Sequence, residues 1–237
     1  MLVDMGEPQV TAPAAGVKGE VRIQEPERWQ QAVARRSAEA RATVPHVELE
    51  TVVSMDRAAE QARDLDCTPA ALVLHACALA LREVPLANAA YRDGKFELYS
   101  RINVGVVVAA DEMYAIPTLF DADTMSPLQL SREVERLHAR ARAGQLASPE
   151  LSGATFTFWD AGELGLTRAA PLVVPPQAAA LAAGAIQPVL QIHDEIPVPT
   201  HPMTITLACD HRILYGSRAA EFLNRVKRQL EEGTPSP

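Results

Sequence analysis

The sequence predicts an α/β fold, a two-layer sandwich in which helices pack on a mixed, largely antiparallel sheet. Apolar and polar residues alternate at period two over residues 203–209, which is typical of a strand with one face in a core. Residues 69–83 and the segment after about residue 217 instead repeat apolar residues at helical spacing. Several of the expected strands are joined by turns of hairpin length, which favours antiparallel pairing.

The composition is that of a folded protein whose partners are not nucleic acids. The chain has 237 residues, of which 48% are apolar and 22% charged, so it can bury a sizeable core. Its formal net charge of −8 argues against DNA and RNA, because affinity for a phosphate backbone depends on clustered Lys and Arg. The longest apolar stretch, residues 71–81, is shorter than the roughly 20 residues of a membrane-spanning helix. We therefore expect a cytoplasmic protein without a membrane partner.

The three cysteines show no metal-binding or redox spacing. Cys67, Cys77 and Cys209 all lie in apolar segments, and no CxxC or Cys/His pattern connects them. They are interpreted as buried thiols in a reducing compartment, and no metal is expected. The glycine-rich motifs of nucleotide-binding loops are also missing from the sequence.

The first half of the chain alternates helices with strands. Val44-Pro45 marks the end of one helix, and Thr68-Pro69 supplies the cap and first turn of another. In chain order we expect a flexible arm over 1–18, an edge strand over 19–23, a helix over 27–43, a strand over 47–55, a helical segment over 55–65 and a helix over 69–83.

The second half is richer in strands. Ser126-Pro127 with Gln129 forms a capping box, and Gly144 follows the end of the helix that it opens. We expect this helix over 127–143, strands over 96–100, 102–109, 153–158, 179–186, 188–193 and 203–209, and a last helix from about 217. Residues 19–232 then form one domain, and 233–237 a polar tail.

Three ionisable residues follow the strand at 203–209. Asp210, His211 and Arg212 lie where this buried strand ends. His211 is a candidate general base, because an imidazole with an ordinary pKa of about 6.5 is mostly neutral yet basic near pH 7. The alternative is a structural histidine that Asp210 and Arg212 hold in place. Cys209 belongs to the inward-facing register of the strand and is interpreted as an inert thiol.

The other histidines favour structural roles. His46 begins a strand, and His75 lies within the most apolar helix. His138 is expected on a helix surface, and His193 and His201 lie in a proline-rich bend.

CDHRILYG, residues 209–216, resembles the DHRxxDG motif of the 2-oxoacid dehydrogenase acyltransferase (E2) catalytic domain, a relative of chloramphenicol acetyltransferase. The resemblance extends in order along the chain and covers about residues 20–232. It is carried by WQQAVARRSAEARATVPHVEL, INVGVVVA, AIPTLFDADTMSPLQLSRE, ARAGQLASPELSGATFTF and VVPPQAAALAAGAI.

This resemblance implies a fold, a base and an assembly. The motif histidine falls on His211, which in the family takes a proton from the thiol of coenzyme A or dihydrolipoamide before sulfur attacks an acyl carbonyl. For an alcohol acceptor, the same base takes the hydroxyl proton and coenzyme A leaves. The family also implies an oxyanion-stabilising serine and a homotrimer whose active sites lie between subunits.

Two positions depart from the family's pattern. Tyr215 replaces the second aspartate of the motif, which in the family is held by an arginine matched here by Arg35 or Arg36. Asp160 and Glu163 are candidate partners for that arginine, because an unpaired buried guanidinium costs several kcal/mol.

The second departure is Trp159, which occupies the position of the oxyanion serine. Thr157, Thr155 and the Trp159 indole N–H are candidate replacements, and Thr157 is favoured because it alternates with Phe156 and Phe158. The alternative for Thr157 is an ordinary strand threonine. Trp159 also narrows the expected channel.

We therefore expect a stand-alone acyltransferase. We expect it to move an acyl group, here acetyl, from a coenzyme A or lipoyl thioester to a small-molecule hydroxyl, such as the tetronate hydroxymethyl group of a natural-product pathway. His211 and Thr157 are the expected catalytic residues. The site around them is expected to be shaped by Asp210, Arg212, Tyr215, Trp159 and Arg36. The sequence shows no lipoyl domain and ends in a polar EEGTPSP, so we expect no attached lipoyl group and a free trimer. The alternative is a catalytically inactive E2-like trimeric scaffold.

Overall fold

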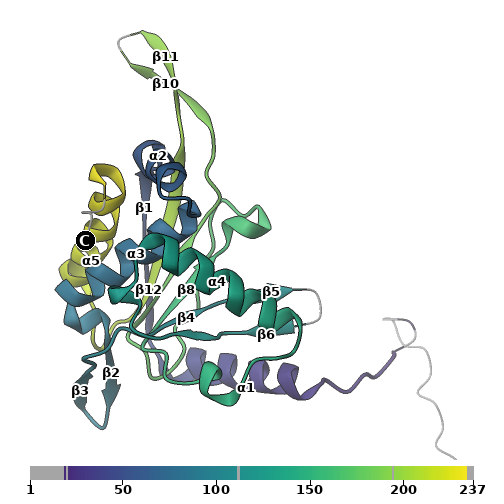
Figure 1. Cartoon of the computed structure of the whole chain (residues 1–237). Coiled ribbons are helices and arrows are strands. Elements are labelled where there is room, and N and C mark those ends of the chain that lie inside the picture. The colour runs from purple at the N-terminus through teal and green to yellow at the C-terminus, as the bar shows by residue number, and fades with distance from the viewer. Residues whose placement is uncertain (1–18, 20, 111–112, 194, 234–237) are drawn as a thin grey trace, which may run out of the picture.

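A six-stranded mixed sheet forms the centre of the computed structural model, which describes residues 19, 21–110, 113–193 and 195–233. The strand order is β1-β12-β9-β8-β4-β7 (Figure 1). The β8 strand runs parallel to both β9 and β4, and the remaining neighbours in the sheet are antiparallel. These strands are β1 (His46–Ser54), β4 (Val104–Val106), β7 (Thr118–Leu119), β8 (Phe156–Asp160), β9 (Ala179–Ala183) and β12 (Pro202–Asp210). The predicted α/β fold with a mixed, largely antiparallel sheet is confirmed.

Helices cover one face of this sheet. Their apolar side chains join those of β8, β9 and β12 in one large cluster that contains Phe156, Leu181, Ile205 and Phe222. The α3 helix is the central member and packs against α4 and α5, while α1 lies apart along the lower edge (Figure 1). The helices are α1 (Arg28–Thr43), α2 (Asp56–Asp64), α3 (Pro69–Glu83), α4 (Pro127–Arg142) and α5 (Gly216–Glu232), with 3₁₀ turns at Pro85–Ala87, Ala122–Thr124, Ser148–Leu151 and Gly162–Leu164.

Local sequence signals fix where the two central helices begin. The Thr68 side chain accepts a hydrogen bond from the amide of Ala71, and Pro69 fills the first turn of α3. Ser126 and Gln129 form the predicted reciprocal capping box at the start of α4. Gly144 takes a φ of +64° just past its end.

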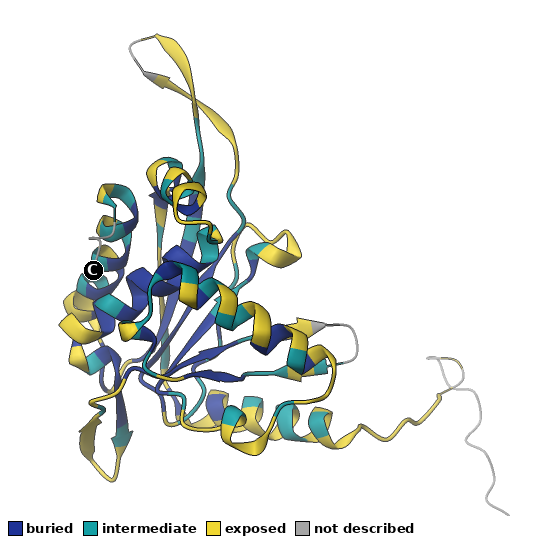
Figure 2. Cartoon of the chain, viewed as in Figure 1, coloured by how far each residue is buried: buried dark blue, intermediate teal, exposed yellow. Residues whose placement is uncertain are grey.

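Three two-stranded hairpins extend from this core. They are β2–β3 (Ala89–Arg92 and Lys95–Leu98), β5–β6 (Val108–Ala110 and Met113–Ala115) and β10–β11 (Val189–His193 and Ile196–Thr200). The β10–β11 hairpin projects furthest, and most of its surface is exposed (Figure 2). Its Leu190 and Ile192 are 71% and 76% exposed.

Most predicted elements are confirmed, and the differences lie at the start of the chain and in the strand expected over 102–109. No strand forms over residues 21–27, so the edge strand expected at 19–23 is wrong. The strand expected over 102–109 is divided at Val107 into β4 and β5, which belong to different sheets. The expected arm over 1–18 and residues 234–237 of the polar tail lie outside the described residues.

Among the described residues, no single helix is both long and apolar enough to cross a bilayer, although α2 and α3 together meet that length and composition with a bend of 104°. The same part of the chain contains no group of three or more His, Cys, Asp and Glu side chains that could hold a metal ion.

Candidate functional site

The turn after β12 is closed by a forked ion pair. Asp210 Oδ1 accepts hydrogen bonds from the backbone N–H and the Nε of Arg212, at 3.0 and 2.9 Å. Asp210 Oδ2 accepts another at 2.6 Å from the terminal NH₂ of the same guanidinium. The carboxylate is buried, and its hydrogen bond is the main cause that raises the pKa of Arg212. Asp210 and Arg212 therefore satisfy each other, and in the described part of the chain neither side chain bonds the His211 ring, as the structural alternative for this motif would require.

His211, the predicted base, is exposed beside that pair. Its backbone N–H donates to the carbonyl of Pro45 at 3.0 Å, which ties the turn to the segment that precedes β1. The imidazole meets the Tyr215 ring edge-on, with 6.0 Å between centroids. It forms no hydrogen bond or ion pair with the described residues. Both ring nitrogens are therefore free for a ligand, and Tyr215 borders the ring instead of pairing an arginine.

Cys209 is the inert thiol that its register predicts. It is fully buried, and the Sγ–H points to the Leu214 carbonyl at 3.2 Å. Burial, and then the charge of Asp210, raises its pKa to about 12. A nucleophilic thiolate does not form at such a position near neutral pH.

The Thr157 hydroxyl is already engaged within the chain. Its Oγ1 donates to Oε1 of Gln177 at 2.6 Å, and Gln177 Nε2 donates to the Ala154 carbonyl at 3.3 Å. A hydroxyl has one hydrogen, so in this arrangement Thr157 has none left for a ligand. Gln177 lies in the segment that resembles the family's PPQ motif, but no pattern in the sequence indicated this bond.

The other two oxyanion candidates differ from each other. Thr155 exchanges hydrogen bonds with the backbone of Asn103, donating to its carbonyl and accepting from its N–H. Trp159 is half-buried, and its indole N–H has no hydrogen bond to a described residue. Of the three candidates, Trp159 alone has a free donor in the described part of the chain.

His211 and Thr157 do not meet within one chain. Thr157 pairs with Ala180, which pairs with Ala208, and His211 lies three residues beyond Ala208. Two strand spacings of about 4.8 Å and three rises of about 3.3 Å therefore place their Cα atoms on the order of 14 Å apart.

The expected partners of Arg36 are occupied elsewhere. Asp160 Oδ1 accepts from the backbone amides of Gly162 and Glu163, at 3.0 and 3.3 Å. Burial, and then the nearby Glu163 carboxylate, raises the pKa of Asp160. Arg35 and Arg36 are exposed on α1 and pair with no described residue. Within one chain, neither arginine therefore pairs with Asp160 or Glu163.

A cavity of about 700 Å³ opens where β8 and β9 end, between the start of α3 and the middle of α4. Both strands run parallel, so their carboxyl ends meet at one edge of the sheet. Its apolar wall is formed by Leu74, Val106, Val134, Phe158 and Met203.

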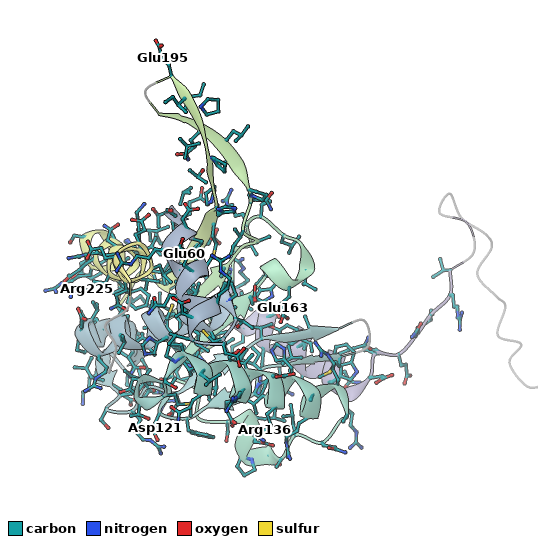
Figure 3. The ribbon with its side chains drawn as sticks, turned by 45° about the horizontal axis from the view of Figure 1, so that its top comes forward. Glu60, Asp121, Arg136, Glu163, Glu195 and Arg225 are labelled. Carbon is teal, nitrogen blue, oxygen red and sulfur yellow. The ribbon has the colours of Figure 1, made fainter. Side chains whose placement is uncertain are left out.

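The polar wall of this cavity contains a buried histidine. His138 was expected on the helix surface, but it is only 6% exposed, and its Nδ1 lies 3.9 Å from Glu163 Oε1. Burial lowers its pKa, against the opposing effect of Glu163. Glu163 lies over the body of the molecule, well away from Glu195 at the hairpin tip (Figure 3). Arg142 is the single arginine of the lining.

The cavity and the candidate base lie at opposite ends of β12. Met203 lines the cavity, and His211 follows eight residues later on the same extended strand. At about 3.3 Å per residue Met203 and His211 are on the order of 26 Å apart, and strand spacing places Phe158, another residue of the cavity wall, on the order of 16 Å from His211. One chain therefore does not bring its own histidine to its own cavity.

Comparisons with known proteins agree with this architecture. The chain is 36% identical over 154 residues to a dihydrolipoyllysine-residue succinyltransferase component of the 2-oxoglutarate dehydrogenase complex from Bartonella vinsonii subsp. berkhoffii, covering 65% of this chain and 37% of that protein. It is 30% identical over 210 residues to a dihydrolipoyllysine-residue acetyltransferase component of the pyruvate dehydrogenase complex from Rickettsia bellii, covering 84% of this chain and 50% of that protein. The chain thus spans about half or less of these curated relatives.

Solved structures show the same fold. The cubic core of the pyruvate dehydrogenase multienzyme complex superimposes with a TM-score of 0.83 at 25% identity, covering 90% of this chain and 93% of that one. Residues 18–235 match the family described as 2-oxoacid dehydrogenases acyltransferase (catalytic domain). Because this match covers nearly the whole sequence, the chain belongs to the 2-oxoacid dehydrogenase acyltransferase family.

Proposed function

We propose that this domain transfers an acyl group between coenzyme A and a thiol or hydroxyl acceptor, with His211 as the general base. The acyl group that we propose is acetyl. The observation that carries the proposal is the imidazole of His211, exposed and without a partner beside the closed Asp210–Arg212 pair. His46, by contrast, uses both of its ring nitrogens within the fold, one with the carbonyl of Val44 and one with the amide of Val173. His211 leaves both free for the proton transfer that acyl transfer requires.

The proton balance of the reaction is simple. The imidazole takes the S–H or O–H proton of the acceptor while that atom attacks the thioester carbonyl. The resulting oxyanion needs a hydrogen-bond donor, and we assign this role to the indole N–H of Trp159, because the hydroxyls of Thr155 and Thr157 are engaged. Collapse of the intermediate breaks the C–S bond, and the leaving thiolate takes the proton back from the imidazolium.

The cavity beside α3 and α4 suits the uncharged arm of a thioester substrate. Its apolar wall accommodates methylene groups, and polar side chains at its rim can meet the amides of such an arm. The carboxylates of Glu135, Asp160 and Glu163 face a single arginine, Arg142, in the lining. The same balance disfavours phosphates inside the cavity, so we place the diphosphate outside it.

A second copy of the chain is needed to complete this site. The cavity and His211 of one chain are too far apart, so we propose that each cavity is served by His211 of a neighbouring copy in a homotrimer. The related cubic core is itself an assembly of a pyruvate dehydrogenase complex, which supports assembly in general but does not fix the number of copies here.

The β10–β11 hairpin offers the surface for that neighbour. Leu190 lies opposite Pro199 and Ile192 opposite Pro197, so these four residues form one apolar face. Both prolines lack an N–H, which makes the β11 edge a poor template for another strand. The hairpin follows directly after the cavity lining at Ile186, so a copy packed on its face also lies near the cavity.

A dithiol is the acceptor that the known relatives favour. The names of the curated relatives specify dihydrolipoyllysine, which favours a dithiol acceptor. A natural-product hydroxyl, such as that of a tetronate, has no support among these relatives. The alternative of an inactive scaffold is supported only by Tyr215 and Trp159, the two positions that depart from the family's pattern.

Acetyl-CoA incubated with dihydrolipoamide, or separately with small alcohols, tests the proposal when free coenzyme A is separated from acetyl-CoA by chromatography. We expect turnover with at least one acceptor, and a loss of about 100- to 10,000-fold in His211→Ala. His201→Ala is the matched control, because His201 is a surface histidine paired with Asp56. Equal turnover in His211→Ala and the parent would contradict the assignment of His211 as the general base. No turnover in the parent with any acceptor would favour the inactive scaffold.

A further inference from the structure

The guanidinium of Arg212 is held on two sides. One side forms the ion pair with the buried Asp210, and the other lies over the ring of Tyr91, with 4.6 Å from Cζ to the ring centroid. Tyr91 belongs to β2, which lies outside the six-stranded sheet. The turn that carries His211 is therefore attached to a separate hairpin through a cation–π contact.

The same short strand also reaches the other half of the candidate site. Ala90, next to Tyr91, forms an isolated β-bridge with Gln177, the residue that accepts the hydrogen bond of the Thr157 hydroxyl. Ala89 packs with Ala178 and Ile213 in a small buried cluster, against which Tyr91 also packs. The β2 strand thus joins the turn after β12 to the segment that runs beside β8.

We propose that Tyr91 is a positioning residue for His211. Its ring fixes the plane of the Arg212 guanidinium, Arg212 fixes the Asp210 carboxylate, and the turn closed by this pair sets the direction of the imidazole between them. The inference rests on the proposed function, because it assigns Tyr91 a role in presenting the base.

The physical need for this contact follows from the exposure of Arg212. Its side chain is 36% exposed, while that of Asp210 is 3% exposed. A half-exposed arginine has many conformations, and holding it in the one that pairs with the buried carboxylate costs side-chain entropy. The aromatic face removes part of that freedom. Without it, Arg212 leaves the buried carboxylate unpaired for part of the time, and the turn loosens.

Variants of the ring separate positioning from folding. Tyr91→Phe keeps the aromatic face, and we expect its kcat to stay within about twofold of the parent. Tyr91→Leu removes it, and we expect kcat to fall by about tenfold or more while KM for acetyl-CoA changes by less than about twofold.

The control is Phe96→Leu. Phe96 contacts the Tyr91 ring in the same hairpin, with 6.1 Å between centroids, but does not touch Arg212. It should match the parent. An equal loss in Phe96→Leu, or in Tyr91→Phe, would overturn the proposal, because the loss would then come from the hairpin fold or from the phenol oxygen.

A double variant and a spectroscopic measurement make the test independent of turnover. Tyr91→Leu combined with Arg212→Lys should lose no more than the larger of the two single changes, because both break one chain of contacts. The NMR signal of the His211 Hε1 proton should change its chemical shift in Tyr91→Leu, because the turn that carries the ring is less fixed, and should keep it in Phe96→Leu. An unchanged signal in Tyr91→Leu would overturn the inference, and it can be read even if the parent transfers no acyl group, which would defeat the proposed function alone.

Discussion

The Thr157 hydroxyl and the side-chain carboxamide of Gln177 form a buried pair, with 2.6 Å between Oγ1 and Oε1. Thr157→Val removes the donor and leaves the Gln177 oxygen unpaired, so we expect a loss of about 1–3 kcal/mol in the free energy of unfolding. The transfer rate of the folded protein should change by no more than a few-fold, because the hydroxyl has no hydrogen to spare. Urea unfolding and initial rates measure the two effects separately.

Trp159→Phe is the counterpart on the same strand. It removes the indole N–H and keeps an aromatic ring, so we expect a fall of about 100- to 1000-fold in kcat if this N–H supports the oxyanion. A large rate loss in Thr157→Val together with a small one in Trp159→Phe would reverse the assignment and restore Thr157 as the donor.

The pH dependence of stability should carry the signature of two buried histidines. Burial lowers the pKa of His75 and of His138 in the folded chain. As the pH falls through the ordinary value of about 6.5, the unfolded chain therefore binds protons that the folded chain does not. The free energy of unfolding should decrease from there towards the folded pKa values, by at most about 1.4 kcal/mol per pH unit for each histidine.

Urea titrations at pH 7.5, 6.5 and 5.5 measure that slope. His75→Gln combined with His138→Gln should flatten it, and His201→Gln, which changes an exposed histidine, should leave it in place. A slope that persists in the double variant would assign the effect to other groups.

The apolar face of the β10–β11 hairpin should be needed for assembly. Replacing Leu190 and Ile192 with Glu places two charges on the proposed interface, and we expect the sedimentation mass to fall to that of a single chain, with loss of transfer. Gln191→Glu adds a charge on the opposite face of the hairpin and serves as the control. A double variant that keeps the parent's mass would show that the neighbour docks elsewhere.

Thiol titration should separate the three cysteines. Cys77 and Cys209 are fully buried, and burial raises the pKa of both. Cys67 is partly exposed, and burial and Asp66 raise its pKa. At pH 8 a disulfide reagent should modify at most Cys67 in the folded protein and all three in urea. Fast modification of Cys209 in the folded protein would contradict its burial.

Local signals made much of the fold predictable. The caps at Thr68 and Ser126 act through neighbours three residues away, and the alternation over 203–209 reports which residues of β12 face the core. The β11 strand was missed because Pro197 and Pro199 count against a strand, although a hairpin tolerates them when their nitrogens face away from its partner.

The site was less predictable because its contacts are distant in sequence. His211 could be singled out from its place at a strand end, but the stacking of Arg212 on Tyr91 joins residues more than a hundred positions apart. The bond between Thr157 and Gln177 depends on how the chain returns across the sheet. His138 was misplaced because its polarity suggested the surface, although it lies four residues after Val134, on the stripe of α4 that faces the core.

Met203 and His211 lie at opposite ends of β12, and this placement predicts the activity of mixtures of two inactive variants. A copy that lacks the imidazole still offers an intact pocket, and a copy with a blocked pocket still offers its imidazole. A variant without the imidazole and a variant with a blocked pocket, each inactive alone, should therefore regain part of the lost turnover when they are unfolded together and refolded as a mixture. Some interfaces in the mixture would combine the intact pocket of one variant with the intact imidazole of the other.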